Sequence, residues 1–225
     1  MSDYKKIDDP FRTGKTYSVR QAAALAKVSH GTVRNWLFGG YEVEPVFGNR
    51  EKGRGDLALV SFLELSELIV AARFRRLKIH LQRIRDAHDF ASKDWKVDYP
   101  FAHLNLQSIG GHILSKFEEE QPAPGGHFVV LSSPEQHVLP GLVSEELANF
   151  EYARDKFAAR WFPFGRGVPV VVDPRFSAGQ PTIVDRGVRV EIIHRRWKAG
   201  ETVNSIARDF ELEPPQVEAV LQHVA

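Results

Sequence analysis

Residues 17–40, YSVRQAAALAKVSHGTVRNWLFGG, constrain this chain most, because their pattern predicts two short helices joined by a turn. Ser18 is a natural N-cap for the first helix, since its hydroxyl can accept an otherwise unpaired backbone N–H of the first turn. We expect this helix to end near Lys27 and Ser29 to cap the second helix. Apolar residues of the first helix recur at helical spacing, at Val19, Ala22, Ala23, Leu25 and Ala26.

The second predicted helix has one apolar face and one polar face. Val33, Trp36 and Leu37 fall at i, i+3 and i+4 and should face inward. The outer face then carries side chains that form hydrogen bonds, as reading base edges requires: His30, Thr32, Arg34 and Asn35. The pattern favours a DNA-binding helix pair, and the alternative is a pair kept for packing or for binding a protein.

The spacing A-x-x-x-A-x-V-S-x-x-T-V-R-x-W resembles the helix-turn-helix of the MerR-like winged-helix family. It is carried here by Ala22, Ala26, Val28, Ser29, Thr32, Val33, Arg34 and Trp36. The resemblance implies a β-hairpin wing after the helix pair, and the sequence offers strands near residues 43–47 and 57–60 around a polar loop. This loop is either a wing that contacts phosphates or a solvated connection. The predicted DNA-binding residues are Ser18, Ser29, His30, Thr32, Arg34, Asn35, Asn49, Arg50, Lys52 and Arg54.

A long helix should begin at Ser61, with one apolar stripe at Phe62, Leu65, Leu68, Ile69 and Ala72. A further helix is predicted at residues 79–87, as in MerR-like proteins. Six Lys and Arg residues between Arg73 and Arg85 are candidates for flanking the DNA backbone. The helix dipole also favours basic residues near a helix C-terminus, so this cluster has a structural explanation as well.

The charge is divided unevenly along the chain. Residues 1–93 hold 17 Lys and Arg against 11 Asp and Glu, whereas residues 94–225 hold 13 against 18. The first segment therefore suits a polyanion and the second does not. There are no cysteines, which excludes disulfides and thiolate metal sites. No leader-like segment or long apolar run is seen, so we expect a cytoplasmic protein without a membrane span.

Residues 94–165 show mixed patterns. Strands are expected at residues 101–107, 112–114 and 127–131, a hairpin turn at Gly110-Gly111, and a helix over residues 142–161. The result would be a small α+β module that joins protomers or separates the two ends of the chain. Residues 161–166 look like a linker held by aromatic side chains.

The C-terminal 50 or so residues resemble the small antitoxin-associated domain of unknown function, family 433. The resemblance implies a strand at Val188-Arg189-Val190 followed by an apolar helix. Thr202 should cap one later helix and Pro214-Pro215 should open another. The outer face of this helix pair is mostly acidic and should bind protein rather than phosphate: Asn204, Arg208, Asp209, Glu211, Glu213 and Glu218. The residues that carry the resemblance are Asp173, Pro174, Gly179, Pro181, Val188, Arg189, Val190, Ala199, Gly200, Glu201, Ile206, Ala207, Asp209, Phe210, Val217, Val220 and Leu221.

A MerR-like reader in front of a family 433 domain resembles a VapB-type antitoxin of a type II toxin–antitoxin system. The resemblance implies a homodimer that binds operator DNA, represses its own operon and neutralises a PIN-like ribonuclease toxin. The predicted toxin-binding residues are Arg186, Arg189, Arg195 and Arg196, since guanidinium groups pair well with the acidic centre of such a nuclease. One alternative is a MerR-like transcription regulator with a ligand-sensing C-terminal region. Another is an adaptor without a DNA role.

The predicted fold class is α+β, with a winged helix-turn-helix domain at residues 1–93, an α+β module at 94–165 and a helical domain at 166–225. Four histidines cluster along the chain, at His103, His112, His127 and His137, but without the spacing of metal ligands. No phosphate-binding glycine loop or nucleophile motif occurs. We therefore expect neither an enzyme nor a metal or other cofactor.

Overall fold

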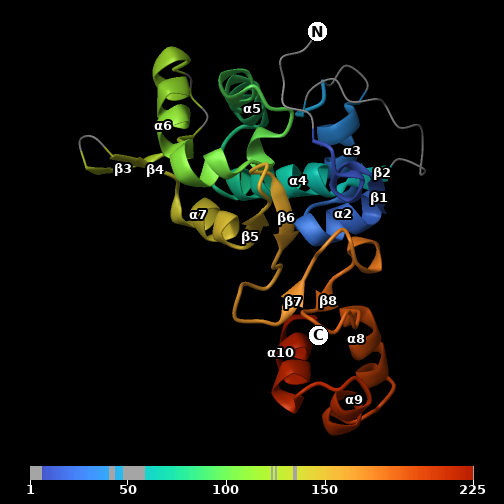
Figure 1. Ribbon diagram of the computed structural model, residues 1–225. Coiled ribbons are helices and arrows are strands. Elements are labelled where there is room, and N and C mark those ends of the chain that lie inside the picture. Colours follow the sequence, from blue (N-terminus) through green and yellow to red (C-terminus); the bar gives the residue numbers. More distant parts are fainter. Residues whose placement is uncertain are drawn as a thin grey trace. The chain divides into compact units, whose positions relative to one another are not determined.

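The computed structural model describes residues 7–40, 44–47, 59–122, 124, 126–133 and 136–224 (Figure 1). The chain forms two compact units. The first unit comprises residues 1–148 and 152–158, and the second comprises residues 149–151 and 159–225. Helices predominate in the described residues and are accompanied by small two-stranded antiparallel sheets, which confirms the predicted α+β class.

The first described element of the first unit is a short capped helix. Helix α1 (Pro10–Thr13) is capped by the Asp9 side chain, and the buried Arg12 bonds both Asp9 and Asp155. Strand β1 (Lys15–Ser18) then pairs antiparallel with β2 (Leu59–Ser61). Tyr17 is fully buried, whereas Phe11 is 55% exposed.

Helices α2 (Val19–Ala26) and α3 (His30–Phe38) follow β1 as the sequence predicts. They pack against each other across the short turn at residues 27–29. Val33, Trp36 and Leu37 are buried, which confirms the predicted inner face of α3. Residues 44–47 do not form the expected strand, because the Val46 N–H donates to the Trp36 carbonyl and holds residues 46–47 against the end of the helix. Val43, at the start of that expected strand, lies outside the described residues.

Helix α4 (Phe62–Arg76) lies in the centre of the first unit (Figure 1). Its predicted apolar stripe is buried, but so are Glu64 and Glu67 on its other faces. Each of these carboxylates has a partner, since Glu64 completes a capping box with Ser61 and bonds Lys15, while Glu67 bonds His88 at 2.9 Å. A helix buried on all sides requires such pairing, because an unpaired buried charge is strongly destabilising.

Helix α5 (Leu81–Trp95) leads through a 3₁₀ turn (Pro100–Ala102) into α6 (Leu104–Glu120). The strands expected at residues 101–107 and 112–114 are therefore wrong, and Gly110-Gly111 lies within a helix rather than in a hairpin turn. The buried residues of α6 recur at helical spacing: Leu106, Gly110, Ile113, Leu114 and Phe117. The alternating pattern at residues 101–107 led to the strand prediction instead. At Gly110 a Cβ atom would lie 3.0 Å from Leu106 Cδ1 and 3.4 Å from Leu139 Cδ1, so glycine permits this packing.

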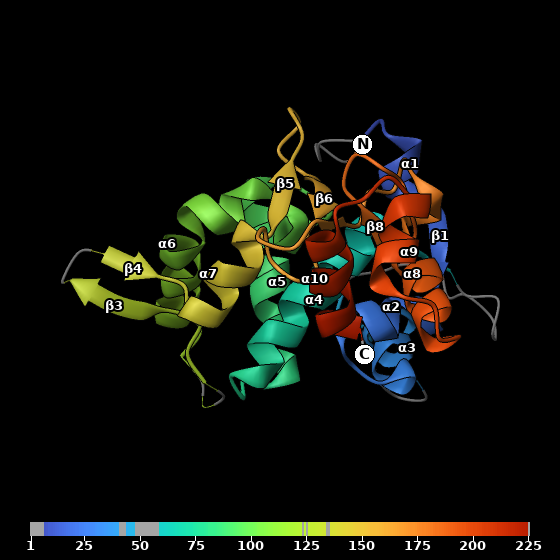
Figure 2. The ribbon, with the colours of Figure 1, turned by 90° about the horizontal axis from the view of Figure 1, so that it is seen from below.

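A hairpin of β3 (Val130–Ser133) and β4 (Gln136–Val138) lies beside α6 in both ribbon views (Figures 1 and 2). Helix α7 (Gly141–Ala148) then packs against α4. The helix expected over residues 142–161 ends there, and β5 (Phe150–Tyr152) and β6 (Ala158–Trp161) form a two-stranded sheet instead. The turn between these strands includes Lys156 with a positive φ of 72°, a conformation that a helix excludes.

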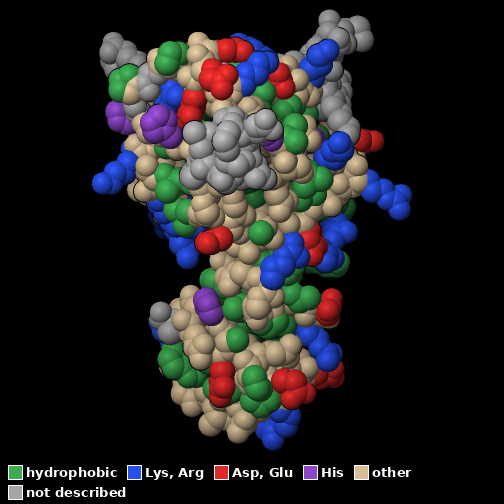
Figure 3. All heavy atoms as spheres, turned by 90° about the vertical axis from the view of Figure 1, so that its left-hand side faces the viewer, with side chains coloured by type: hydrophobic (Ala, Val, Ile, Leu, Met, Phe, Trp, Pro, Cys, Tyr) green, Lys and Arg blue, Asp and Glu red, His purple; other side chains and the backbone are tan. Residues whose placement is uncertain are grey.

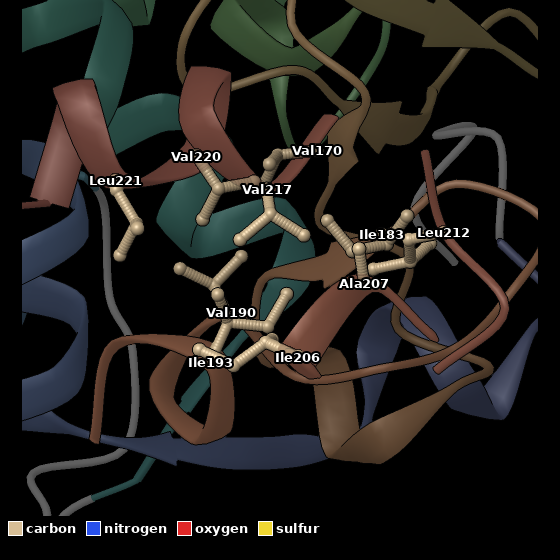
Figure 4. Close-up of a cluster of buried hydrophobic side chains, with 10 residues drawn as sticks. All are labelled: Val170, Ile183, Val190, Ile193, Ile206, Ala207, Leu212, Val217, Val220 and Leu221. Carbon is tan, nitrogen blue, oxygen red and sulfur yellow. The ribbon is translucent and has the colours of Figure 1, made fainter. Parts of the chain in front are cut away.

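The second unit contains β7 (Val170–Val171), a 3₁₀ turn (Ser177–Gly179), β8 (Thr182–Ile183) and three helices. These are α8 (Val190–Lys198), α9 (Val203–Asp209) and α10 (Pro214–Val224). Its core gathers apolar side chains from all of them except the 3₁₀ turn. Figure 4 shows Val190, Ile193 and Ile206 turned toward one another within this core.

Two expectations for this unit are resolved by the structure. The predicted Thr202 cap of α9 is confirmed. The V-R-V strand is wrong, because Arg189 is the N-cap of α8 and Val190 is its first residue. Among the described helices, none has both the length and the apolar character needed to cross a membrane.

Candidate DNA-binding and partner-binding sites

Side-chain caps fix both helices of the α2–α3 pair. The Ser18 hydroxyl accepts the Gln21 N–H at 3.2 Å, and Gln21 Oε1 accepts the Ser18 N–H at 2.9 Å, forming a capping box. Ser29 Oγ accepts the Thr32 N–H at 3.0 Å and lies 2.7 Å from Thr32 Oγ1. The predicted capping roles of Ser18 and Ser29 are thus confirmed, and the Thr32 hydroxyl is engaged with the cap.

The predicted outer face of α3 carries four polar residues that differ in exposure. His30 and Asn35 are exposed, while Thr32 and Arg34 are half-buried. Exposed imidazole and amide groups can donate and accept hydrogen bonds at base edges in the major groove. His30 and Asn35 are therefore the α3 side chains most open to such contacts.

Two further cations of the α2–α3 pair are not among the predicted DNA-binding residues. Arg20 on α2 and Lys27 in the turn are both exposed. Lys27 has a left-handed backbone, with φ 54°, at the C-cap of α2. Helical spacing places Arg20 on the polar side of α2, but that pattern alone does not separate a DNA-facing cation from a solvated one.

The wing candidates Asn49, Arg50, Lys52 and Arg54 lie outside the described residues. Residues 59–61, at the end of the expected hairpin, do form a strand, and within the described part of the chain its partner is β1.

The basic cluster between Arg73 and Arg85 is largely committed to the fold. Arg83 is buried, donates to the carbonyls of Gly126 and Gln121, and lies 5.0 Å from the centre of the Phe117 ring. Arg85 donates to the carbonyls of Pro45 and Glu44.

Arg73 is likewise paired with the buried Glu146, and Arg75 donates to the Ile79 carbonyl. Backbone carbonyls and carboxylates thus already bind the guanidinium groups of Arg73, Arg75, Arg83 and Arg85, which favours the structural explanation for these four residues. Arg76 and Lys78 remain as exposed cations of this segment.

The outer face of the α9–α10 pair is exposed at every residue that the sequence analysis assigned to it. Acidic side chains with some basic neighbours are visible on this unit at the bottom of Figure 3. An acidic surface of this kind disfavours contact with phosphate.

The four predicted toxin-binding arginines have different surroundings. Arg186 is exposed and pairs with the exposed Glu211 at 3.1 Å. Arg189 and Arg195 are exposed, and among the described residues their side chains have no hydrogen-bond or ion-pair partner. Arg195 and Arg196 are neighbours in α8 and project about 100° apart.

Arg196 joins α8 to the α9 region. It is paired with Glu201 and with Asp209, and it lies 5.0 Å from the centre of the Phe210 ring. Hydrogen bonds from Arg196 lower the pKa of both carboxylates, and those same bonds raise the pKa of the guanidinium. Near Arg195, the 40% exposed Trp197 stacks on His194, with the ring centres 6.4 Å apart.

Asp173 is the centre of a second ionic cluster, which the sequence analysis noted only as part of a motif. It is 2% exposed, accepts from Arg160 Nε at 2.8 Å, and accepts from Arg175 at 2.9 and 2.6 Å. Burial alone would raise the pKa of Asp173, but the hydrogen bonds from Arg175 and Arg160 outweigh it and lower this pKa.

This cluster borders a pocket of about 340 Å³. The pocket lies entirely within the second unit and is lined by Arg160, Val171, Asp173, Phe176 and residues 182–187. Its lining includes a single aromatic side chain, Phe176.

Among the described residues, no group of three or more His, Asp and Glu side chains is arranged to hold a metal ion. His103 is buried, caps α6 and packs edge-on against Phe157, so its place has a structural explanation. His112 and His127 are exposed.

Residues 170–223 match the protein family of unknown function DUF433. Over 93% of both chains, the sequence is 27% identical to a Mycobacterium tuberculosis protein named "Putative antitoxin VapB45". The fold is similar to the crystal structure of Rv2018 from Mycobacterium tuberculosis, with a TM-score of 0.80 and 26% identity, covering 92% of this chain and 97% of that one. The chain is thus similar along nearly its whole length to a protein with an antitoxin name, and its second unit carries a DUF433 segment.

Proposed function

We propose that this protein is the antitoxin of a type II toxin–antitoxin system and not an enzyme. It binds a PIN-like ribonuclease toxin and represses its own operon. The observation that carries this proposal is the similarity to a protein named as an antitoxin over 93% of both chains, because it spans both compact units.

The first unit binds operator DNA as a MerR-like winged helix. Helix α3 enters the major groove with His30, Thr32, Arg34 and Asn35, while the N-terminal ends of α2 and α3, at Ser18 and Ser29, approach phosphates. Exposed Arg20 and Lys27 add positive charge to this surface. The loop with Asn49, Arg50, Lys52 and Arg54 is the wing, and a homodimer places two α3 helices about 34 to 36 Å apart in successive grooves.

The second unit binds the toxin through α8 and the loop before it. Arg189 and Arg195 are the best placed, since their side chains are exposed and have no partner among the described residues. Arg186 can exchange its exposed partner Glu211 for a carboxylate of the nuclease, because exposed ion pairs contribute little. The exposed Trp197 supports a protein-binding role for α8, since Trp and Arg are enriched in interfaces.

Two measurements test the two halves of this proposal. In the first, the chain is produced together with the reading frame beside its own gene, and co-purification and loss of ribonuclease activity are measured. We expect a stable complex in which the nuclease is silent, whereas an active nuclease in the presence of excess chain contradicts the toxin role.

In the second measurement, fluorescence anisotropy compares a duplex of the chain's own promoter with a scrambled duplex over a range of salt concentrations. Contacts to about six phosphates predict a log–log salt slope on the order of −5. Equal affinity for both duplexes contradicts operator recognition. A promoter affinity that responds to a small molecule, without any toxin, favours the ligand-sensing regulator.

A further inference from the structure

We propose that the pocket of the second unit is an anchor site for a partner protein. It receives a segment in which a bulky apolar side chain stands next to a carboxylate. The proposal rests on the proposed function in one respect, namely that the toxin is the protein that supplies this segment. The pocket contains none of the predicted toxin-binding arginines except Arg186.

The size and floor of the pocket suit an apolar side chain. Its volume of about 340 Å³ falls within the range of roughly 300–1,000 Å³ that is usual for ligand pockets. The side chains of Val171, Thr182 and Ile183 line it and are otherwise buried. An apolar group that enters the pocket is therefore transferred from water to a largely apolar surface, which is favourable.

The charged groups around the pocket suit a carboxylate next to that apolar group. Asp173 accepts a hydrogen bond from Arg160 Nε, which fixes the orientation of the guanidinium. Among the described residues, the Nη groups of Arg160 are then paired only with Glu151, at 3.6 Å. Arg186 pairs with Glu211, whose side chain is 81% exposed. Exposed ion pairs of this kind contribute little to stability. A carboxylate of a protein segment that excludes water from the pocket can therefore replace Glu151 as the partner of Arg160, or Glu211 as the partner of Arg186.

The mouth of the pocket carries an aromatic side chain that the fold does not bury. Phe176 is 56% exposed and is followed by the 3₁₀ turn Ser177–Gly179. In that turn Ser177 and Ala178 both have positive φ angles, of 48° and 52°. Backbone strain of this kind clusters at binding sites. A protein segment seated in the pocket would cover the Phe176 ring.

The same charges disfavour other occupants. Arg160 and Arg186 in the lining disfavour a cationic segment. An apolar residue beside Asp or Glu can contact the buried side chains of the pocket and also pair with Arg160 or Arg186.

The test uses the full-length chain labelled with ¹⁵N and the blocked dipeptide acetyl-Phe-Asp-amide as the probe. We expect amide shifts at Thr182, Val184 and Gly187 that saturate with probe concentration. Acetyl-Ala-Asp-amide lacks the apolar group and acetyl-Phe-Lys-amide lacks the carboxylate, so both should bind about tenfold more weakly or worse. Absence of shifts with the first probe, or equal shifts with all three, would overturn the proposal. Equal binding of 3-phenylpropionate would overturn the assignment to a protein segment.

Two variants locate the site. Val184→Trp places a larger side chain in the lining of the pocket, where it occupies the volume that the probe needs. It should weaken probe binding at least about tenfold. Phe176→Ala removes the exposed ring and should weaken it a few-fold without affecting the fold. Phe11→Ala is the matched control, because Phe11 is equally exposed, at 55%, but belongs to the first unit. Wild-type binding in both pocket variants would contradict the assignment.

The proposed function and this inference fail in different ways. Probe binding by a chain that does not inhibit the neighbouring nuclease leaves the pocket assignment standing and removes the toxin as its partner. Inhibition of the nuclease that is unchanged in Val184→Trp and Phe176→Ala, with no probe binding, leaves the antitoxin function standing and removes the pocket.

Discussion

Arg196 on α8 donates a hydrogen bond to Asp209, the last residue of α9, with 2.5 Å between Nη2 and Oδ2. The same guanidinium bonds Glu201 and lies against the Phe210 ring. Arg196 thus connects the helices of the second unit, whereas its neighbour Arg195 is exposed without such contacts among the described residues. Two adjacent arginines of one helix therefore have different roles available to them.

Replacing these two arginines should separate stability from partner binding. Arg196→Ala should lower the melting temperature of the second unit by a few degrees, because Glu201 and Asp209 lose their common partner. Arg195→Ala should leave the melting temperature unchanged and weaken binding of the toxin. Circular dichroism melts and calorimetric titration with the toxin check both expectations. A larger loss of stability in Arg195→Ala than in Arg196→Ala would contradict them.

Asp173 should make the stability of the second unit depend on acid pH. Its pKa is lowered in the folded chain below the ordinary 3.8, so its contribution is complete above the ordinary pKa and is lost as pH falls through the lowered value. At pH 7, Asp173→Asn should lower the free energy of unfolding by about 1–3 kcal/mol, since Arg160 and Arg175 are partly exposed. The difference from the wild type should shrink as pH falls below about 4.

Urea unfolding at pH 7 and pH 3, followed by tryptophan fluorescence, measures this difference. Asp185→Asn removes an exposed carboxylate from the same unit and should change neither value. A stability difference for Asp173→Asn that stays constant between the two pH values speaks against the ionic role of Asp173.

Ser29 should have a structural role that can be separated from any contact with DNA. Ser29→Ala removes the α3 cap and should cost about 1 kcal/mol of stability. Ser29→Asp keeps a cap and suits the helix dipole, so stability should return. If the α3 N-terminus approaches phosphates, the added negative charge should still weaken DNA binding. Urea unfolding and anisotropy titration measure the two effects.

Thr202→Ala is the matched control, because it removes an equivalent cap from α9 in the second unit. It should destabilise the chain without changing the affinity for DNA. Full recovery of DNA binding in Ser29→Asp would place the DNA elsewhere on the molecule.

The two parts of the proposed DNA surface should respond differently to alanine substitution. His30→Ala and Asn35→Ala should reduce the preference for the promoter over the scrambled duplex, by about 1–3 kcal/mol for each lost base contact. A triple alanine variant of Arg50, Lys52 and Arg54 should weaken binding to both duplexes and reduce the log–log salt slope by about 3.

The control for charge is a triple alanine variant of Lys116, Lys198 and Arg208, which are all exposed outside the proposed surface. It should leave the salt slope close to that of the wild type. An equal reduction of the slope in both triple variants would mean that net charge, rather than a wing, governs the binding.

The sequence by itself determined the helices whose signals are local. Ser18, Ser29 and Thr202 cap helices as predicted, because a cap depends on a hydroxyl and on N–H groups two or three residues away. The buried faces of α3, α9 and α10 were likewise predictable, since residues three and four apart lie on one side of a helix.

Tertiary structure decided the features that depend on residues far apart in the chain. Residues 104–120 form a helix although part of the segment alternates like a strand, because their apolar residues at helical spacing are buried within the first unit. The sequence makes Arg83 and Arg85 candidates for phosphate binding and Arg196 a candidate for toxin binding. In the structure, carbonyls and carboxylates from other parts of the chain accept hydrogen bonds from all three. The pocket beside Asp173 also exists only once Arg160 and residues 182–187 are brought together, which no local pattern specifies.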